Sequence, residues 1–133
     1  MPEHVLVVED EAILGVMLED ALEAAGVKQV EICSTTDLAL EALRRKQPDA
    51  IVLDVHLADR DDGWAIAELV KALGPDSPRI IFSTGQPKDI PEHIAEMGSV
   101  LEKPYDPAVL VDVLCQPEKR GMISRLRGAL RPS

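Results

Sequence analysis

The 133-residue chain is long enough for one domain around one hydrophobic core, and 46% of its residues are apolar. Aromatic residues make up only 2%, so we expect an aliphatic core and no base-stacking platform for single-stranded nucleic acid. The formal net charge of −10 argues against general attraction to phosphate backbones or anionic lipid, and no direct binding of nucleic acid is expected.

Five short apolar runs predict five β-strands. They are residues 5–8, 30–33, 51–55, 80–82 and 100–101. The third run is apolar on both faces except at Asp54. Such a pattern is typical of a parallel strand that helices cover on both sides.

Segments of helical periodicity separate the runs. The first carries an apolar stripe and ends at Gly26. The members of that stripe are Ile13, Leu14, Met17, Leu18, Ala21, Leu22 and Ala25. The second helix begins near Ser34, which has the spacing of a capping box with Asp37, and it ends before Pro48.

The later helices have clear start or stop signals. The third has an apolar stripe, formed by Ile66, Leu69, Val70 and Leu73. It ends at Gly74, a short fourth helix begins near Pro91, and the fifth opens with Asp106 as N-cap before Pro107. The resulting (βα)5 order predicts a doubly wound α/β fold with a five-stranded parallel sheet and right-handed crossovers.

The composition changes sharply near Pro117. Residues 118–133 contain five basic residues and one glutamate, a net charge of +4, which leaves −14 for residues 1–117. Apolar residues recur in this segment at helical spacing, at Met122, Ile123, Leu126, Ala129 and Leu130. We therefore expect a folded domain over residues 1–117 and a basic amphipathic tail over 118–133. The tail is either a helical extension or a contact for a partner or for the acidic domain itself.

Cellular location and the remaining polar residues give weaker signals. The first residues lack the basic segment of a signal peptide, and no apolar run approaches the ~20 residues of a membrane span, so a cytoplasmic protein is expected. The two cysteines, Cys33 and Cys115, fit no metal-binding spacing and are expected to be small core residues. His4 and His93 are expected on the surface.

Polar residues stand at the ends of four predicted strands. Glu9 and Asp10 follow the first strand, Asp54 lies near the end of the third, Thr84 ends the fourth, and Lys103 follows the fifth. Strand ends of a doubly wound sheet converge on one edge, where ligands bind. Crowded carboxylates favour a cation, and oxygen ligands select Mg²⁺ or Mn²⁺. A polar residue at any one of these positions alone is more often a loop residue or a helix cap than a functional residue. Together they suit phosphoryl transfer to a carboxylate nucleophile.

Four motifs resemble those of the receiver domains of two-component response regulators, and together with the five-unit alternation of strands and helices they cover about residues 4–116. They are LVVEDE at 6–11, IVLDV at 51–55, FSTG at 82–85 and EKPY at 102–105. The resemblance implies a flavodoxin-like sheet with strand order 2-1-3-4-5. It also implies that Asp54 is the phosphoacceptor, that Thr84 is the switch hydroxyl and that Lys103 binds the phosphoryl group.

The same resemblance implies the metal ligands and the partners. Glu9, Asp10, Asp54 and the backbone carbonyl of His56 would hold the cation. A sensor histidine kinase or a histidine phosphotransfer protein would donate the phosphoryl group, and an unknown downstream protein would receive the signal. The chain would then be a single-domain response regulator, not an enzyme beyond its own phosphorylation and dephosphorylation.

The chain departs from the family pattern at Val100, where many members have an aromatic ring, and at Gly63, which stands one residue later than expected. The FSTG motif is similar to that of an alphaproteobacterial Phe-Ala-Thr-Gly subgroup. A haloacid-dehalogenase-type phosphatase is an alternative, although His56 stands where its second acid would be. A flavodoxin-like cofactor binder is another, although Glu9 would repel a phosphate group after the first strand.

Overall fold

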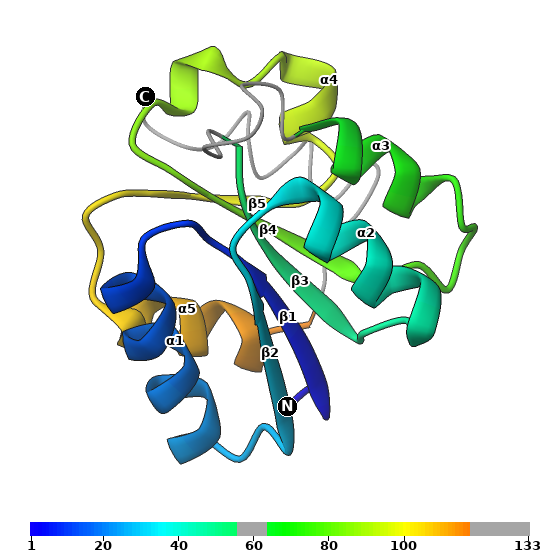
Figure 1. Ribbon diagram of the computed structural model, residues 1–133. Helices are drawn as coiled ribbons and strands as arrows, with labels where there is room; N and C mark the ends of the chain where they lie inside the picture. The colour runs from blue at the N-terminus through cyan, green and yellow to red at the C-terminus, as the bar shows by residue number, and fades with distance from the viewer. Residues whose placement is uncertain (56–63, 118–133) are drawn as a thin grey trace.

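Five parallel strands form one sheet in the order β2-β1-β3-β4-β5 (Figure 1). The computed structural model describes residues 1–55 and 64–117. The strands are β1 (His4–Val8), β2 (Gln29–Cys33), β3 (Ala50–Asp54), β4 (Arg79–Thr84) and β5 (Ser99–Glu102). The predicted fold class and strand order are confirmed, and each strand lies within two residues of its predicted bounds.

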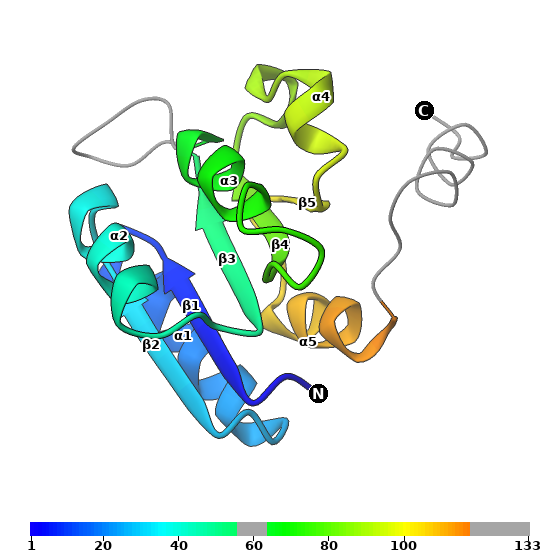
Figure 2. The ribbon, with the colours of Figure 1, turned by 90° about the vertical axis from the view of Figure 1, so that its right-hand side faces the viewer.

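Helices cover both faces of this sheet. They are α1 (Ala12–Ala24), α2 (Thr36–Arg45), α3 (Trp64–Lys71), the 3-10 helix η1 (Pro87–Asp89), α4 (Glu92–Ala95) and α5 (Pro107–Cys115). Figures 1 and 2 show α1 and α5 together on one face, and α2 and α3 on the other. Among the described residues, no helix combines the length and the apolar character needed to cross a membrane.

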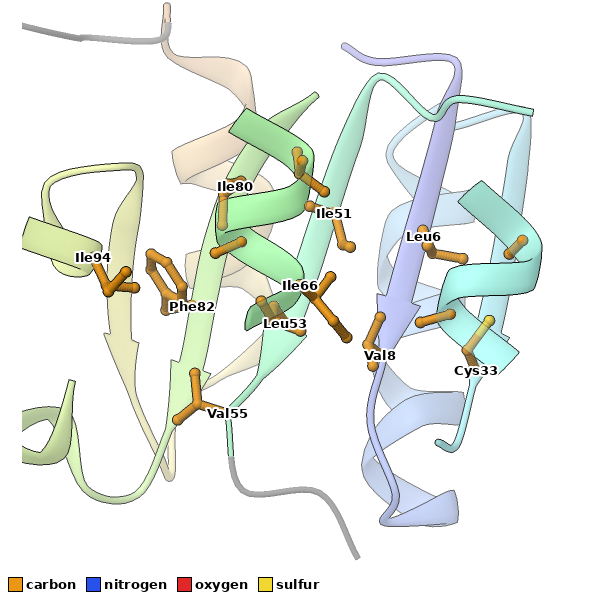
Figure 3. Close-up of a cluster of buried hydrophobic side chains, with 14 of the residues drawn as sticks. Leu6, Val8, Cys33, Ile51, Leu53, Val55, Ile66, Ile80, Phe82 and Ile94 are labelled. Atoms are coloured by element: carbon orange, nitrogen blue, oxygen red, sulfur yellow. The ribbon is translucent and has the colours of Figure 1, made fainter. Parts of the chain in front are cut away.

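The alternation of side chains along each strand supplies two separate cores. In β3, Ile51 and Leu53 join the cluster beneath α2, α3 and α4, whereas Ala50 and Val52 join the cluster beneath α1 and α5. Figure 3 shows the first cluster, in which Phe82 is fully buried. The double coverage explains why β3 is apolar on both faces, as predicted.

Two predicted helical stripes are only partly buried. The buried members are Leu18, Leu22, Ile66 and Val70. Ile13, Met17, Leu69 and Leu73 are instead exposed, with exposed fractions of 79%, 48%, 48% and 52%. The sheet covers a narrower arc of each helix than the apolar residues occupy, so the outer edge of each stripe faces solvent.

The helix ends follow the predicted chemistry except at α2. The N-cap of α2 is Thr35, whose side chain accepts a hydrogen bond from the backbone N–H of Leu38 at 3.1 Å. The helix therefore begins near Ser34 as predicted, but the predicted capping by Ser34 was wrong. Thr35 has the extended backbone that an N-cap needs, with φ −136° and ψ 162°. Asp106 caps α5 as predicted, because its carboxylate accepts from the N–H of Ala108 at 2.9 Å. Gly26 ends α1 with a φ of +105°, which favours glycine.

The burial of two residues differs from the prediction: His4 was expected on the surface, and Cys115 was expected in the core. His4 is only 5% exposed, and neither ring nitrogen has a hydrogen-bond partner within the described part of the chain. Burial, and to a smaller extent Lys46, lowers the pKa of His4 below its ordinary value. Cys115 is exposed at the end of α5, contrary to prediction, whereas Cys33 is buried in the core and His93 is exposed, as predicted.

Candidate functional site

The predicted site residues lie at the carboxyl edge of the sheet. Asp54 is the last residue of β3 and Thr84 the last of β4, while Glu9 and Lys103 directly follow β1 and β5. Backbone hydrogen bonds continue the sheet through the last two: the N–H of Glu9 donates to Cys33 at 3.0 Å, and that of Lys103 donates to Thr84 at 2.8 Å. The sheet itself therefore fixes the backbone positions of these side chains.

Three carboxylates meet at this edge. Glu9, Asp10 and Asp54 each offer one carboxylate oxygen, and these oxygens all lie within 4.8 Å of one another. Glu9 and Asp54 are 2% and 5% exposed, and Asp10 is less buried. Negative charges at this separation repel one another strongly where water is largely excluded.

Lys103 bridges two of the carboxylates. Its ammonium nitrogen Nζ lies 2.7 Å from Oε1 of Glu9 and 3.4 Å from Oδ2 of Asp54. The side chain of Lys103 is 18% exposed, whereas those of Glu9 and Asp54 are 1% and 6% exposed. Among the described residues, therefore, one positive charge faces three carboxylates, and these four side chains carry more negative than positive charge when all are ionised.

Burial and the neighbouring charges shift the pKa values of Glu9 and Lys103. Burial raises the pKa of Glu9 from 4.5 to about 7, and Asp54 adds to the rise, although the hydrogen bonds from Lys103 and from the N–H of Glu11 oppose it. For Lys103, burial lowers the pKa, but the attraction of Glu9 and Asp54 outweighs burial, and the net change is a rise. Glu9 therefore exchanges its proton near neutral pH while Lys103 stays charged.

Thr84 lies at the same edge and is fully buried. Its oxygen Oγ1 accepts a hydrogen bond from the backbone N–H of Gln86 at 3.0 Å, which tightens the turn after β4 around Gly85. This bond uses a lone pair of the oxygen and leaves the hydroxyl proton available for donation. The predicted carbonyl ligand, His56, lies outside the described residues.

The sequence did not indicate a second polar link beside the site. The hydroxyl groups of Ser83 and Tyr105 lie 2.9 Å apart, within hydrogen-bonding distance. Ser83 pairs with Asp54 in the register of β3 and β4, and Tyr105 is two residues beyond Lys103. The link thus joins β4 to the segment that carries Lys103. Burial raises the pKa of Tyr105, so its hydroxyl stays protonated at neutral pH.

Comparison with known proteins identifies the family. The family described as the response regulator receiver domain matches residues 5–115. The chain is 35% identical over 108 residues to protein-glutamate methylesterase/protein-glutamine glutaminase 1 of Anaeromyxobacter dehalogenans, which covers 78% of the chain and 30% of that relative. It is 28% identical to the chemotaxis protein CheY of Thermotoga maritima, over 90% of the chain and all of CheY.

A solved structure agrees with these matches. The CheY-like receiver domain from Methylobacillus flagellatus has a TM-score of 0.75 and 26% identity to this chain, and the match covers 86% of the chain and 98% of that structure. The chain spans less than half the length of the first curated relatives it matches, so the methylesterase activity of one of them belongs to a much longer protein. The chain therefore belongs to the family of response regulator receiver domains and has a phosphoacceptor role in signalling.

Proposed function

We propose that this chain accepts a phosphoryl group on Asp54 in a metal-dependent reaction and then switches or relays a signal through protein–protein contacts. Receiver domains of response regulators are phosphorylated by histidine kinases. The donor would be a sensor kinase or a histidine phosphotransfer protein. The observation that carries the proposal is the bridge from Lys103 to Asp54 and Glu9, because it sets a fixed positive charge beside a buried carboxylate nucleophile.

The residues present fit a hard divalent cation. Glu9, Asp10 and Asp54 offer oxygen ligands in one cluster, and Mg²⁺ or Mn²⁺ prefers such ligands. The backbone carbonyl of His56 would complete the protein ligands. When bound, the cation supplies positive charge that the carboxylates and the phosphoryl oxygens share.

The chemistry of the transfer follows from the positions of three side chains. A carboxylate oxygen of Asp54 attacks the phosphorus of a phosphohistidine, the new P–O bond forms, and the P–N bond breaks as the imidazole leaves. The ammonium of Lys103 stabilises charge on a phosphoryl oxygen, and the hydroxyl of Thr84 donates a hydrogen bond to another. Water later cleaves the aspartyl phosphate and returns Asp54 to its carboxylate form.

A phosphatase that uses an aspartyl nucleophile is not favoured. The family match is to the response regulator receiver domain, which is generally not an enzyme, and the methylesterase activity of one relative belongs to a much longer protein. The protein would then hold its phosphoryl group as a signal and would turn over no other substrate.

The proposal is tested by labelling with a small phosphodonor such as radiolabelled phosphoramidate, with Mg²⁺ or with EDTA. We expect base-labile labelling of the wild type that needs Mg²⁺ and is lost in Asp54→Asn. Glu102→Gln is the matched control, because Glu102 is an exposed acid beside Lys103, and it should label like the wild type. Undiminished labelling of Asp54→Asn would refute the assignment.

A further inference from the structure

A groove runs between α1 and α5 on the face of the sheet away from α2 and α3. Its volume is about 570 Å³. Apolar side chains, including Met17, Ala21 and Val111, form part of its lining. Asp20, Asp106 and Asp112 add three carboxylates, and the described residues that line it include no lysine or arginine. Figure 1 shows the two helices side by side at this position.

The apolar lining continues onto the outer side of α1. Ile13, Val16 and Met17 are 79%, 50% and 48% exposed, and they lie three to four residues apart or adjacent, so they share one side of the helix. Together with the groove they form an apolar face with an acidic border. We call the groove and these three residues the α1–α5 face.

The tail at residues 118–133 has the complementary chemistry. It carries a net charge of +4, and its apolar residues recur at helical spacing between basic ones. A segment of this kind can lay apolar side chains against an apolar groove while its arginines meet carboxylates at the border. Asp20 and Asp112 are exposed and have no ion pair with another described residue, so they are available to such a segment.

The tail starts close enough to this face to reach it on its own domain. The described chain ends at Pro117, two residues after α5, and α5 is itself one wall of the groove. Residues 122–131 as a helix would be about 15 Å long, and the part of α1 from Met17 to Ala24 spans about 10 Å. Covalent attachment also raises the effective concentration of the tail to about the millimolar range, which favours docking within one chain.

We infer that the tail docks on the α1–α5 face of its own domain and covers it, as a basic amphipathic segment on an acidic, apolar groove. The inference goes beyond the proposed function and does not depend on the role of Asp54. A partner protein that uses this face would have to displace the tail first.

The test is paramagnetic broadening in the full-length ¹⁵N-labelled protein. A spin label is attached through Ser124→Cys in a Cys115→Ser background, because Cys115 is exposed and Cys33 is buried. We expect selective signal loss at backbone amides of Met17–Ala25 and 108–112, and none across α2. The loss should weaken near 1 M salt, where the screening length is about 3 Å.

Charge reversals separate specific docking from general attraction. Replacing Arg125, Arg127 and Arg131 by Glu in one variant changes the tail from +4 to −2 and should abolish the broadening. Asp20→Lys with Asp112→Lys should also abolish it. The matched control, Glu41→Lys with Glu68→Lys, reverses two exposed acids on the opposite face and should leave it unchanged.

Three results would overturn the inference. The first is broadening that spreads evenly over the domain, and the second is broadening centred on α2 or α4. The third is broadening that appears when a spin-labelled ¹⁴N chain is mixed with a ¹⁵N chain that carries no spin label. The last result would mean that the tail reaches a second copy instead of its own domain.

Discussion

Replacing the buried acid Glu9 by glutamine should remove a pH dependence from the stability of the metal-free protein. Glu9 is 2% exposed, and burial raises its pKa to about 7 from an ordinary value of 4.5. The folded state therefore holds this proton more tightly than the unfolded chain. The stabilisation is fully present below pH 4.5 and is lost as the pH rises through about 7.

The size of the effect follows from the two pKa values of Glu9. Their difference corresponds to about 3 kcal/mol, of which about 2.5 kcal/mol should be lost between pH 5 and pH 8. The glutamine variant has no proton to lose, and its amide oxygen still accepts a hydrogen bond from Lys103. The stability of Glu9→Gln relative to the wild type should therefore rise by about 2.5 kcal/mol from pH 5 to pH 8.

Urea unfolding in EDTA, followed by the fluorescence of Trp64, measures this difference. Glu11→Gln is the matched control, because it removes one exposed negative charge beside the site and should leave the pH dependence of the wild type unchanged. Mg²⁺ should stabilise the wild type at pH 8 more than at pH 5, since metal binding needs ionised carboxylates. A difference between Glu9→Gln and wild type that does not vary with pH would refute the reasoning.

Three further predictions test the fold. His4→Leu should stabilise the protein by about 1–3 kcal/mol, because it removes two buried ring nitrogens without hydrogen-bond partners among the described residues. The gain should be larger at pH 5 than at pH 8, because burial lowers the pKa of His4 and the wild type loses stability as the pH falls towards that lowered pKa. Urea unfolding at the two pH values measures the difference. Thr35→Ala should cost about 1 kcal/mol through loss of the α2 cap, whereas Ser34→Ala should change the urea midpoint little. Gly98→Ala should cost about 1–3 kcal/mol or prevent folding, since a Cβ there would clash with the backbone carbonyl oxygen of Ile80. An unchanged thermal midpoint would contradict this.

The architecture could be predicted from the sequence because its signals are local. Each strand is a short apolar run, and the helix-end signals at Gly26 and Asp106 act over a few residues. The strand order could not be obtained this way, since it depends on contacts between distant segments, and it came from the resemblance. Helical periodicity identified α1 and α3 but not the width of their buried faces, because that width depends on how much of each helix the sheet covers.

Residues whose environment depends on packing were harder to predict. His4 belongs to a strand that is buried on both sides, so its ring is buried although histidine is usually exposed or partly so. Cys115 lies in the last turn of α5, where its neighbour Leu114 is buried in the core and Cys115 itself is exposed. The hydrogen bond between Ser83 and Tyr105 joins residues 22 apart, and no spacing rule connects them.

The grouping of the site residues could be predicted because it follows from one geometric rule. The carboxyl ends of parallel strands meet at one edge, so Glu9, Asp54 and Lys103 had to be neighbours once the strands were assigned. The sequence could not show that Lys103 lies closer to Glu9, at 2.7 Å, than to Asp54, at 3.4 Å, because these distances depend on the three-dimensional arrangement of the side chains.

The central claim, that Asp54 carries the phosphoryl group, is tested most directly by chemical trapping. The protein is phosphorylated with a small phosphodonor and Mg²⁺ and then treated with borohydride, which reduces an acyl phosphate to the alcohol and converts the modified aspartate to homoserine. Peptide mass spectrometry then locates the change. We expect homoserine at position 54 and at no other acid, and only when both donor and Mg²⁺ are present. Homoserine at Asp10, or at any other aspartate with Asp54 intact, would contradict the account.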